Sequence, residues 1–281
     1  MKTAGHTPMR IDVVNNQVVT GDFVKLSRDL PAGCARLIVA DPPFNIGYRY
    51  DVYDDAKEPQ EYLEWAERWL PAAIRLLAPG GAFWLAAGDE CAAEYKVRLD
   101  SFGLQFRSWV IWHYTFGVHT EGKFSRCHSH LLYYIKPGAA HTWHPERIKI
   151  VSARQEMGDK RAAEGGKVPP DVWTISRVCG TFGERIKRPS GGTSHPCQQP
   201  EAMLERVIAS CSEPGDLVLD PFAGSGTTAA TAKRLRRDYW TCDLSPAYAD
   251  VTRKRLAKVS VFADDDSDMN DLARELGIDG G

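Results

Sequence analysis

A short apolar run that ends in an acid and two prolines constrains this chain most strongly. Residues 37–40 read Leu-Ile-Val-Ala, and Asp41, Pro42, Pro43 and Phe44 follow directly. A partly β-branched run of this length predicts a buried strand of a parallel sheet. The strand ends at the prolines, because proline has no N–H to donate and fixes φ. The sequence therefore predicts a stiff loop at the carboxyl end of a strand, where open α/β sheets bind ligands.

The groups on this loop suit the amino group of a nucleic-acid base. Asp41 and the Pro42 carbonyl can each accept one of its two N–H groups, and Phe44 can stack on the ring. With both hydrogens held, the nitrogen lone pair is turned toward an electrophile on the opposite side. The alternative is a Pro-Pro loop in which Asp41 only caps a turn.

A second predicted strand ends in Asp220 and leads into a glycine turn. Gly224 and Gly226 permit a positive φ and a close approach of the backbone to a ligand. No Lys precedes Thr227, so the phosphate-loop motif fails, and the third glycine of a dinucleotide fingerprint is missing. Asp243 ends the next predicted strand about 20 residues on, where nucleoside-binding folds hold a ribose diol. The turn therefore predicts a nucleoside site without phosphates.

The Asp-Pro-Pro-Phe loop and the Phe-x-Gly-x-Gly turn together resemble the S-adenosylmethionine-dependent amino-methyltransferases of DNA. The loop comes before the turn, which is the motif order of their permuted β class, and the resemblance covers roughly residues 15–260. Residues 195–200, His-Pro-Cys-Gln-Gln-Pro, match a third segment of the family, although Gln199 stands where Lys is usual. Asp-Pro-Pro with an aromatic is the more adenine-leaning form, whereas Ser-Pro-Pro accompanies cytosine N4 more often. Phe44 replaces the commoner Tyr.

The resemblance implies a doubly wound, mostly parallel α/β sheet of the Rossmann-like methyltransferase type, with S-adenosyl-L-methionine as the cofactor. It implies direct in-line methyl transfer to N6 of a flipped adenine. The alternatives are cytosine N4, an RNA or protein methyltransferase, and a non-catalytic DNA-binding relic. The implied catalytic residues are Asp41, Pro42, Pro43 and Phe44. The implied cofactor-binding residues are Asp22, His195, Pro196, Asp220, Phe222, Gly224, Ser225, Gly226, Thr227 and Asp243. Asp22 has an alternative role as the N-cap of a short helix.

Periodicity and the resemblance divide the chain into four parts. We expect residues 1–138 and 195–262 to form the catalytic and cofactor-binding halves of one domain. We expect a basic target-recognition insert over 139–194 and an acidic tail over 263–281. Alternating patterns predict strands over 13–20, 37–40, 82–87, 106–113, 129–135, 217–220 and 239–243, and helices over 59–77, 91–102 and 229–236.

The insert carries the positive charge that a DNA-binding surface needs. Residues 145–190 hold ten Lys/Arg and six Asp/Glu, a net charge of +4 within a chain of net charge −2. Basic residues interleaved with aromatic ones suit phosphate contact and base stacking, here by Trp143, Trp173 and Phe182. The alternative is a solvated excursion. The predicted DNA-binding residues are Tyr48 and Tyr50, from a loop over 47–57 expected to close over the site, and Lys149, Arg154, Lys160, Arg161, Lys167, Arg177 and Arg185.

Three further patterns are weaker. The spacing of Cys127 and the histidines at 113, 119, 128 and 130 fits no zinc motif, so we expect no metal and assign them to DNA contact. Residues 264–275 place acids at calcium-loop positions, but Met269 occupies the position that needs glycine. Cys197 resembles the nucleophile of cytosine C5-methyltransferases, yet an exocyclic amine needs no covalent activation.

Composition bounds the remaining expectations. The seven cysteines form no C-x-x-C pair, which predicts reduced thiols and a cytoplasmic protein. No signal peptide or long apolar run is present, so we expect no membrane partner. The resemblance implies double-stranded DNA as the partner, and it is compatible with a homodimer and with a cognate restriction endonuclease.

Overall fold

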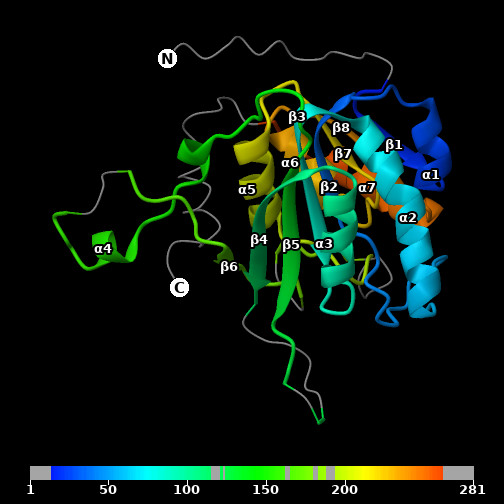
Figure 1. Cartoon of the computed structure of the whole chain (residues 1–281), viewed down its shortest axis with the longest axis horizontal. Helices are drawn as coiled ribbons and strands as arrows, with labels where there is room; N and C mark the ends of the chain where they lie inside the picture. Colours follow the sequence, from blue (N-terminus) through cyan, green and yellow to red (C-terminus); the bar gives the residue numbers. More distant parts are fainter. Residues whose placement is uncertain are drawn as a thin grey trace.

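One eight-stranded sheet organises the structure. Its strands are β1 (Gln17–Thr20), β2 (Ala35–Ala40), β3 (Leu77–Ala87), β4 (Gln105–His113), β5 (His128–Ile135), β6 (Val172–Thr174), β7 (Leu217–Asp220) and β8 (Asp238–Asp243). They lie in the order β1-β8-β7-β2-β3-β5-β4-β6 (Figure 1). The computed structural model describes residues 14–114, 121–122, 124–161, 165–179, 183–187 and 194–261. Within these ranges only β5 runs antiparallel to its neighbours, so the predicted doubly wound, mostly parallel sheet is confirmed.

Helices cover both faces of the sheet. One apolar core joins one face to α1 (Phe23–Leu26), α2 (Pro59–Leu76) and α3 (Ala92–Ser101). A second core joins the other face to α5 (Glu201–Cys211), α6 (Thr227–Arg234) and α7 (Pro246–Leu256). Short helices complete the set: η1 (Ser27–Asp29), η2 (Pro145–Ile148) and α4 (Ala153–Glu156). No helix of the described ranges is long and apolar enough to span a bilayer.

Helix α2 follows its sequence pattern closely. Pro59 occupies the first turn, where its missing N–H costs nothing. Tyr62, Ala66, Trp69 and Ala73 recur at helical spacing and are completely buried. This stripe of large side chains fixes α2 against the sheet, and the predicted helix over 59–77 is confirmed to within one residue.

The strand predicted over 82–87 starts too late, because Pro79, Gly80 and Gly81 also belong to it. Strand β3 begins at Leu77 and runs through all three residues. The Gly80 N–H donates to the Lys136 carbonyl over 2.8 Å, and the Lys136 N–H donates to the Gly81 carbonyl over 3.0 Å. These bonds to the chain just after β5 draw the glycines into the ladder, which local sequence could not indicate.

The predicted insert is also less irregular than expected. Strand β6 pairs in parallel with β4 and extends the sheet, and Trp173 at its centre is only 6% exposed. Its indole N–H donates to the Pro170 carbonyl over 2.8 Å. Trp173 is therefore a core residue, and its predicted role in base stacking is wrong. The leading residues, Phe182 and the tail over 263–281 lie outside the described ranges.

The parallel strands bring acidic residues to one edge. Asp41, Asp220 and Asp243 stand at the carboxyl ends of β2, β7 and β8, while Asp22 and Asp89 follow β1 and β3. Strands β7 and β2 are neighbours, but the chain leaves them in opposite directions, toward β8 and toward β3. Open α/β sheets form a ligand crevice at such a switch point.

We expect Gly226→Ala to destabilise the fold strongly. Gly226 has a φ of 75°, and a Cβ there would lie 2.6 Å from Cγ2 of Thr252. The left-handed backbone costs about 1–2 kcal/mol for a residue with a Cβ, and overpacking adds about 1–3 kcal/mol. Urea unfolding measures the loss.

The matched control is Gly103→Ala. Gly103 has a φ of 73°, and nothing lies within 4 Å of its added Cβ. The free energy of unfolding of this variant should fall only by the cost of the left-handed backbone conformation, about 1–2 kcal/mol. Equal losses in the two variants would show that the contact with Thr252 has no energetic weight.

Candidate active site

A cavity of about 1100 Å³ opens at the carboxyl edge of the sheet. This volume exceeds the ~300–1,000 Å³ of a pocket for one drug-sized ligand. Among the predicted residues, the cavity is lined by Asp22, Asp41, Pro42, Pro43, Phe44, Tyr48, Tyr50, Arg177, His195, Pro196, Asp220, Phe222, Gly224, Ser225, Thr227 and Asp243. Gly226 packs on Thr252 behind the turn instead. The strand ends thus bring together motifs that lie far apart in the sequence.

The Asp-Pro-Pro-Phe loop forms a rigid part of the cavity wall. The hydroxyl of Tyr62, on α2, donates to the Pro43 carbonyl over 2.7 Å and lies 2.8 Å from the hydroxyl of Tyr95. Among the described residues, no donor forms a hydrogen bond to the Pro42 carbonyl. The buried tyrosine pair therefore fixes one carbonyl of the loop and leaves its neighbour available to a ligand.

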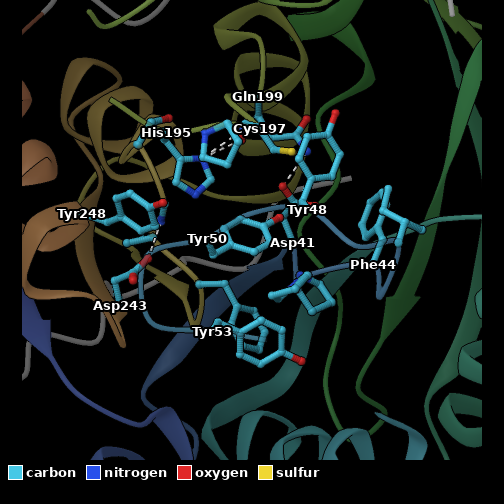
Figure 2. Close-up of a pocket in the computed structure, with 18 of the residues that line it drawn as sticks. Asp41, Phe44, Tyr48, Tyr50, Tyr53, His195, Cys197, Gln199, Asp243 and Tyr248 are labelled. Carbon is cyan, nitrogen blue, oxygen red and sulfur yellow. Dashed lines mark hydrogen bonds between the residues drawn. The ribbon is translucent and has the colours of Figure 1, made fainter. Parts of the chain in front are cut away.

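Within the part of the chain that the structure describes, the carboxyl of Asp41 has one hydrogen-bond partner. Nε2 of Gln199 donates to Oδ2 over 2.6 Å, and burial raises the pKa of Asp41 to about 6 in spite of this bond. In Figure 2, Asp41 and Tyr50 lie between Phe44 on one side and Asp243 with Tyr248 on the other. The carboxyl thus stands between the two ends of the cavity.

Two more carboxyls hold the glycine turn. Oδ1 of Asp220 accepts the Phe222 N–H over 2.9 Å, and Oδ2 of Asp243 accepts the Gly224 N–H over 2.8 Å. Burial raises the pKa of Asp220 to about 7 and that of Asp243 to about 6. Asp22 accepts the Lys25 N–H over 3.0 Å, so it is the N-cap of α1 as well as a cavity residue.

His195 lies directly against the glycine turn. A Cβ added to Gly224, whose φ is 51°, would lie 3.0 Å from Cε1 of the imidazole, so any other residue would crowd the ring and strain the backbone. The ring meets Tyr248 edge-on at 4.6 Å and Tyr50 at 5.7 Å between centroids. Burial lowers the pKa of His195 to about 4. His195 is therefore a neutral, packed ring at physiological pH.

The tyrosine-rich loop over 47–57 is tied down at several points. Asn45, with a φ of 58°, donates to the Lys57 carbonyl over 2.8 Å and accepts its N–H over 2.7 Å. Asp55 accepts three backbone N–H groups of residues 45–48. The Ser245 hydroxyl donates to Asp51 over 2.6 Å, which joins the loop to the start of α7. These bonds hold Tyr48 and Tyr50 in the cavity wall.

The predicted DNA-binding residues separate into two groups. Arg177 lies 5.0 Å from the ring centre of Tyr114, and both line the cavity. The other predicted basic residues lie outside the cavity: Lys149, Arg154, Lys160, Arg161, Lys167 and Arg185. Most of them belong to the segment around α4 that extends away from the sheet, which we call the arm (Figure 1). Arg161 pairs with Asp159, and Arg185 donates to the Val178 carbonyl over 3.0 Å.

Asp89, His128 and His130 form a possible metal-ligand set at the cavity rim. However, Nε1 of Trp109 donates to Nδ1 of His130 over 2.9 Å, so Nε2 carries the ring proton toward Asp89. Arg126 donates to the same carboxylate over 3.0 Å. A metal ion would have to displace that proton and compete with the guanidinium, so the cluster favours an ion-pair network. Our expectation of no metal stays a prediction, and His119 lies outside the described ranges.

Sequence reasoning missed the residues that act through long-range contacts. Tyr114, Arg126 and Tyr248 line the cavity, and nothing in their local sequence indicates it. The one usable signal was at Gln199, which departs from the lysine of the resembling family.

Comparison with known proteins identifies the family. A family model described as a DNA methylase, of the N6/N4 methyltransferase type, matches residues 35–254. The Type II methyltransferase M.HpaI of Haemophilus parainfluenzae is 31% identical over 245 residues, which span 86% of this chain and 74% of that protein. M.BglII, of Bacillus subtilis, is 30% identical over 258 residues, spanning 86% and 69%.

Solved structures share the fold. The cytosine-N4-specific PvuII DNA methyltransferase superposes with a TM-score of 0.64 at 18% identity, covering 94% of this chain and 92% of that one. A putative DNA modification methylase from Thermus thermophilus, in complex with S-adenosyl-L-methionine, gives 0.61 at 22% identity, covering 88% and 96%.

The cavity, its motifs and these matches define the class: a Rossmann-like DNA methyltransferase. The chain belongs to the N6/N4 DNA methylase family, whose members modify an exocyclic amino group of adenine or cytosine.

We expect Asp220→Asn to stabilise the ligand-free protein more at pH 8 than at pH 5. Asp220 is 5% exposed, and its folded-state pKa of about 7 lies above that of the unfolded chain. The carboxyl therefore stabilises the fold at low pH, and this contribution is lost as the pH rises through about 7. Asparagine keeps the acceptor for the Phe222 N–H without the charge, and its advantage should grow by about 1–3 kcal/mol between the two pH values.

Urea unfolding at pH 5 and pH 8 measures this difference. Asp29→Asn, at an exposed position of η1, is the control for the removal of a surface carboxyl. An advantage of Asp220→Asn that does not change with pH would contradict the assignment of a raised pKa.

Proposed function

We propose that this protein is a site-specific Type II DNA methyltransferase that moves a methyl group from S-adenosyl-L-methionine to N6 of a flipped adenine. One observation carries the proposal. The Asp41 carboxyl and the unoccupied Pro42 carbonyl form part of the wall of a cavity that also contains the glycine turn and the carboxyls of Asp220 and Asp243. Asp41 and the Pro42 carbonyl suit an amine with two N–H donors. The carboxyls of Asp220 and Asp243 suit a cationic nucleoside.

The residues around the glycine turn fit this cofactor in charge and shape. Asp41, Asp220 and Asp243 have raised pKa values, and no Lys or Arg of the described residues forms an ion pair with Asp41 or Asp243. Such a cavity favours a positively charged ligand, which would lower these pKa values on binding. Asp243 would hold the ribose hydroxyls, as acids at this position do in nucleoside-binding folds, and Asp22 would lie near the adenine. S-adenosyl-L-methionine, when bound, supplies a methyl group on a cationic sulfonium.

The chain's own residues then orient the target. Asp41 and the Pro42 carbonyl would accept the two N–H groups of the amine, which turns its lone pair toward the methyl group. Phe44 would stack on the base. Asp41 would also stabilise the positive charge that develops on nitrogen, while Tyr62 keeps the loop rigid. Holding the reacting atoms in near-attack geometry can supply several kcal/mol of the barrier reduction.

The target base must leave the DNA duplex to reach this loop. Tyr48 and Tyr50 line the cavity and are positioned to stack on an extruded base. Arg177 connects the insert to the same cavity, while the arm presents exposed basic residues for backbone phosphates. Double-stranded DNA is the substrate that this arrangement fits, and a homodimer and a cognate restriction endonuclease are further partners that we propose by family likeness.

Cytosine N4 is the second candidate target. The PvuII enzyme, which superposes with a TM-score of 0.64, is described as cytosine-N4-specific. The Asp-Pro-Pro-Phe loop favours adenine, because the family uses Ser-Pro-Pro more often for cytosine. The two reactions differ in the flipped base and share the chemistry at nitrogen.

Nucleoside mass spectrometry tests the choice of base. Unmethylated plasmid DNA, incubated with the protein and S-adenosyl-L-methionine, should yield N6-methyladenine. N4-methylcytosine would keep the mechanism and change the base. No modified base, despite tight cofactor binding, would overturn the proposal and direct attention to RNA or protein substrates.

We expect Asp41→Ala to reduce methyl transfer at least ~100-fold, the loss typical of a deleted group that stabilises transition-state charge. Cofactor affinity should stay within a few-fold of wild type, because the glycine turn and Asp243 are unchanged. Single-turnover methylation and calorimetric titration with S-adenosyl-L-methionine measure the two effects. Asp29→Ala is the control for removal of an exposed carboxylate. Near-normal turnover of Asp41→Ala would show that this loop does not orient the amine.

We expect Lys160→Ala to weaken DNA binding without altering sequence preference. Lys160 is exposed on the arm, where it would contact phosphate. Loss of one phosphate contact makes the negative slope of log K against log salt concentration shallower by about 0.9. Binding to fluorescent duplexes between 50 and 200 mM salt, roughly the range in which such contacts dominate, measures the slope. Lys258→Ala, exposed just after α7, is the matched control and should keep the wild-type slope. Equal slopes in the two variants would contradict the role of the arm.

A further inference from the structure

Among the described residues, Gln199 makes the one hydrogen bond that holds the Asp41 carboxyl in place. Its Nε2 lies 2.6 Å from Oδ2 of Asp41, and its backbone carbonyl accepts the Thr227 hydroxyl over 3.2 Å. The residue therefore connects the Asp-Pro-Pro-Phe loop to the first residue of α6, directly after the glycine turn. Figure 2 shows Gln199 and Cys197 above Asp41, on the chain segment that also carries His195.

The orientation of the Gln199 amide is set by this bond. In the described part of the chain, Oε1 of Gln199 is buried and has no hydrogen-bond partner. An unpaired buried acceptor is unfavourable. The hydrogen bond from Nε2 to Asp41 must therefore be worth more than the cost of leaving Oε1 unpaired. An ionised carboxylate accepts and does not donate, so Nε2 is the amide atom that faces Oδ2. Oδ1 is then the carboxylate oxygen available to the target amino group.

A neutral amide orients the carboxyl without neutralising it. The groups that face Asp41 are Asp220 from β7, Tyr50 from the tyrosine loop and Cys197 from the segment before α5. None of these side chains is cationic, and no ion pair to Asp41 occurs among the described residues. Burial therefore raises the pKa of Asp41 to about 6, with only the Gln199 bond acting against it. A lysine at position 199 would add an opposite charge and lower that pKa.

We propose that Gln199 is a positioning residue for methyl transfer, which holds Oδ2 of Asp41 so that Oδ1 meets the target amine. The inference rests on the proposed function and goes beyond it, because Gln199 itself touches neither the base nor the reacting methyl group. It assigns a role to the position at which this chain departs from the lysine of its family.

Three variants of the full-length protein test the role. Gln199→Ala removes the donor, and single-turnover methylation of plasmid DNA should fall about 10- to 100-fold, as expected for a lost hydrogen bond to a charged group. The KM for DNA and the cofactor affinity should stay within about threefold. Gln199→Lys restores a donor, so the rate at pH 8 should recover relative to Gln199→Ala. The pH at which the single-turnover rate falls to half on the acid side should be about 1–3 pH units lower in Gln199→Lys than in wild type.

Gln198→Ala is the matched control. The neighbouring glutamine binds the Glu184 carbonyl over 2.6 Å and the Ile186 N–H over 3.0 Å, so it holds the insert and does not touch Asp41. This variant should raise the KM for DNA and leave the pH midpoint of the single-turnover rate unchanged. Thermal unfolding of all four proteins shows that each variant is folded.

A titration without DNA separates this inference from the proposed function. Carbon-13 NMR of aspartate-labelled protein follows the Asp41 carboxyl, which Asp41→Ala identifies. A lower titration midpoint in Gln199→Lys, with the rate effects above, supports the role. An unchanged midpoint, or a rate of Gln199→Ala within twofold of wild type, overturns it. A shifted midpoint in a protein that methylates no DNA would overturn the proposed function and support the contact between Gln199 and Asp41.

Discussion

The pairing of β2 with β7 is the constraint on which the candidate site depends. Leu37 faces Val218 and Ile38 faces Leu219 in this pair, so two segments from opposite ends of the chain run side by side in parallel. Their carboxyl ends meet at one edge, and Asp41 and Asp220 become neighbours whose negative charges oppose each other. A slip of one residue would turn every side chain of the strand to the other face of the sheet. The apolar cores on both faces therefore fix the register that assembles the site.

Helix α2 braces both motifs against this edge. Tyr62 holds the Pro43 carbonyl, while Trp65 and Trp69 pack against the ring of Phe222, at 5.6 Å and 5.0 Å between centroids. A single helix thus supports the Asp-Pro-Pro-Phe loop and the glycine turn at once. This aromatic packing holds the segments that carry Asp41 and Asp220 close together, although no cation of the described residues pairs with Asp41. A catalytic constellation of this kind needs a support whose own side chains are locked by packing.

The sequence predicted the parts of the site that local chemistry determines. A strand that ends in Asp-Pro-Pro, or in a glycine turn, carries its geometry in adjacent residues, and the cavity contains both. Long-range contacts carried no such signal: nothing near Gln199 indicates a bond to Asp41, and nothing near Arg177 indicates that it enters the cavity. Trp173 was mispredicted for the same reason. Its basic, irregular sequence surroundings suggested a surface position, but the pairing of β6 with β4 places it in the core. Raised pKa values were also beyond prediction, since they depend on burial.

Residues 195–199 explain how separate parts of the site can act as one. His195 packs on the glycine turn, and Gln199 donates to Asp41, only four residues further on. Between them, Gln198 holds the backbone of the insert through both atoms of its amide. The residue that anchors the insert is therefore adjacent to the one that anchors the Asp41 carboxyl. Hydrogen bonds from two consecutive residues thus connect the insert and Asp41 to one short segment.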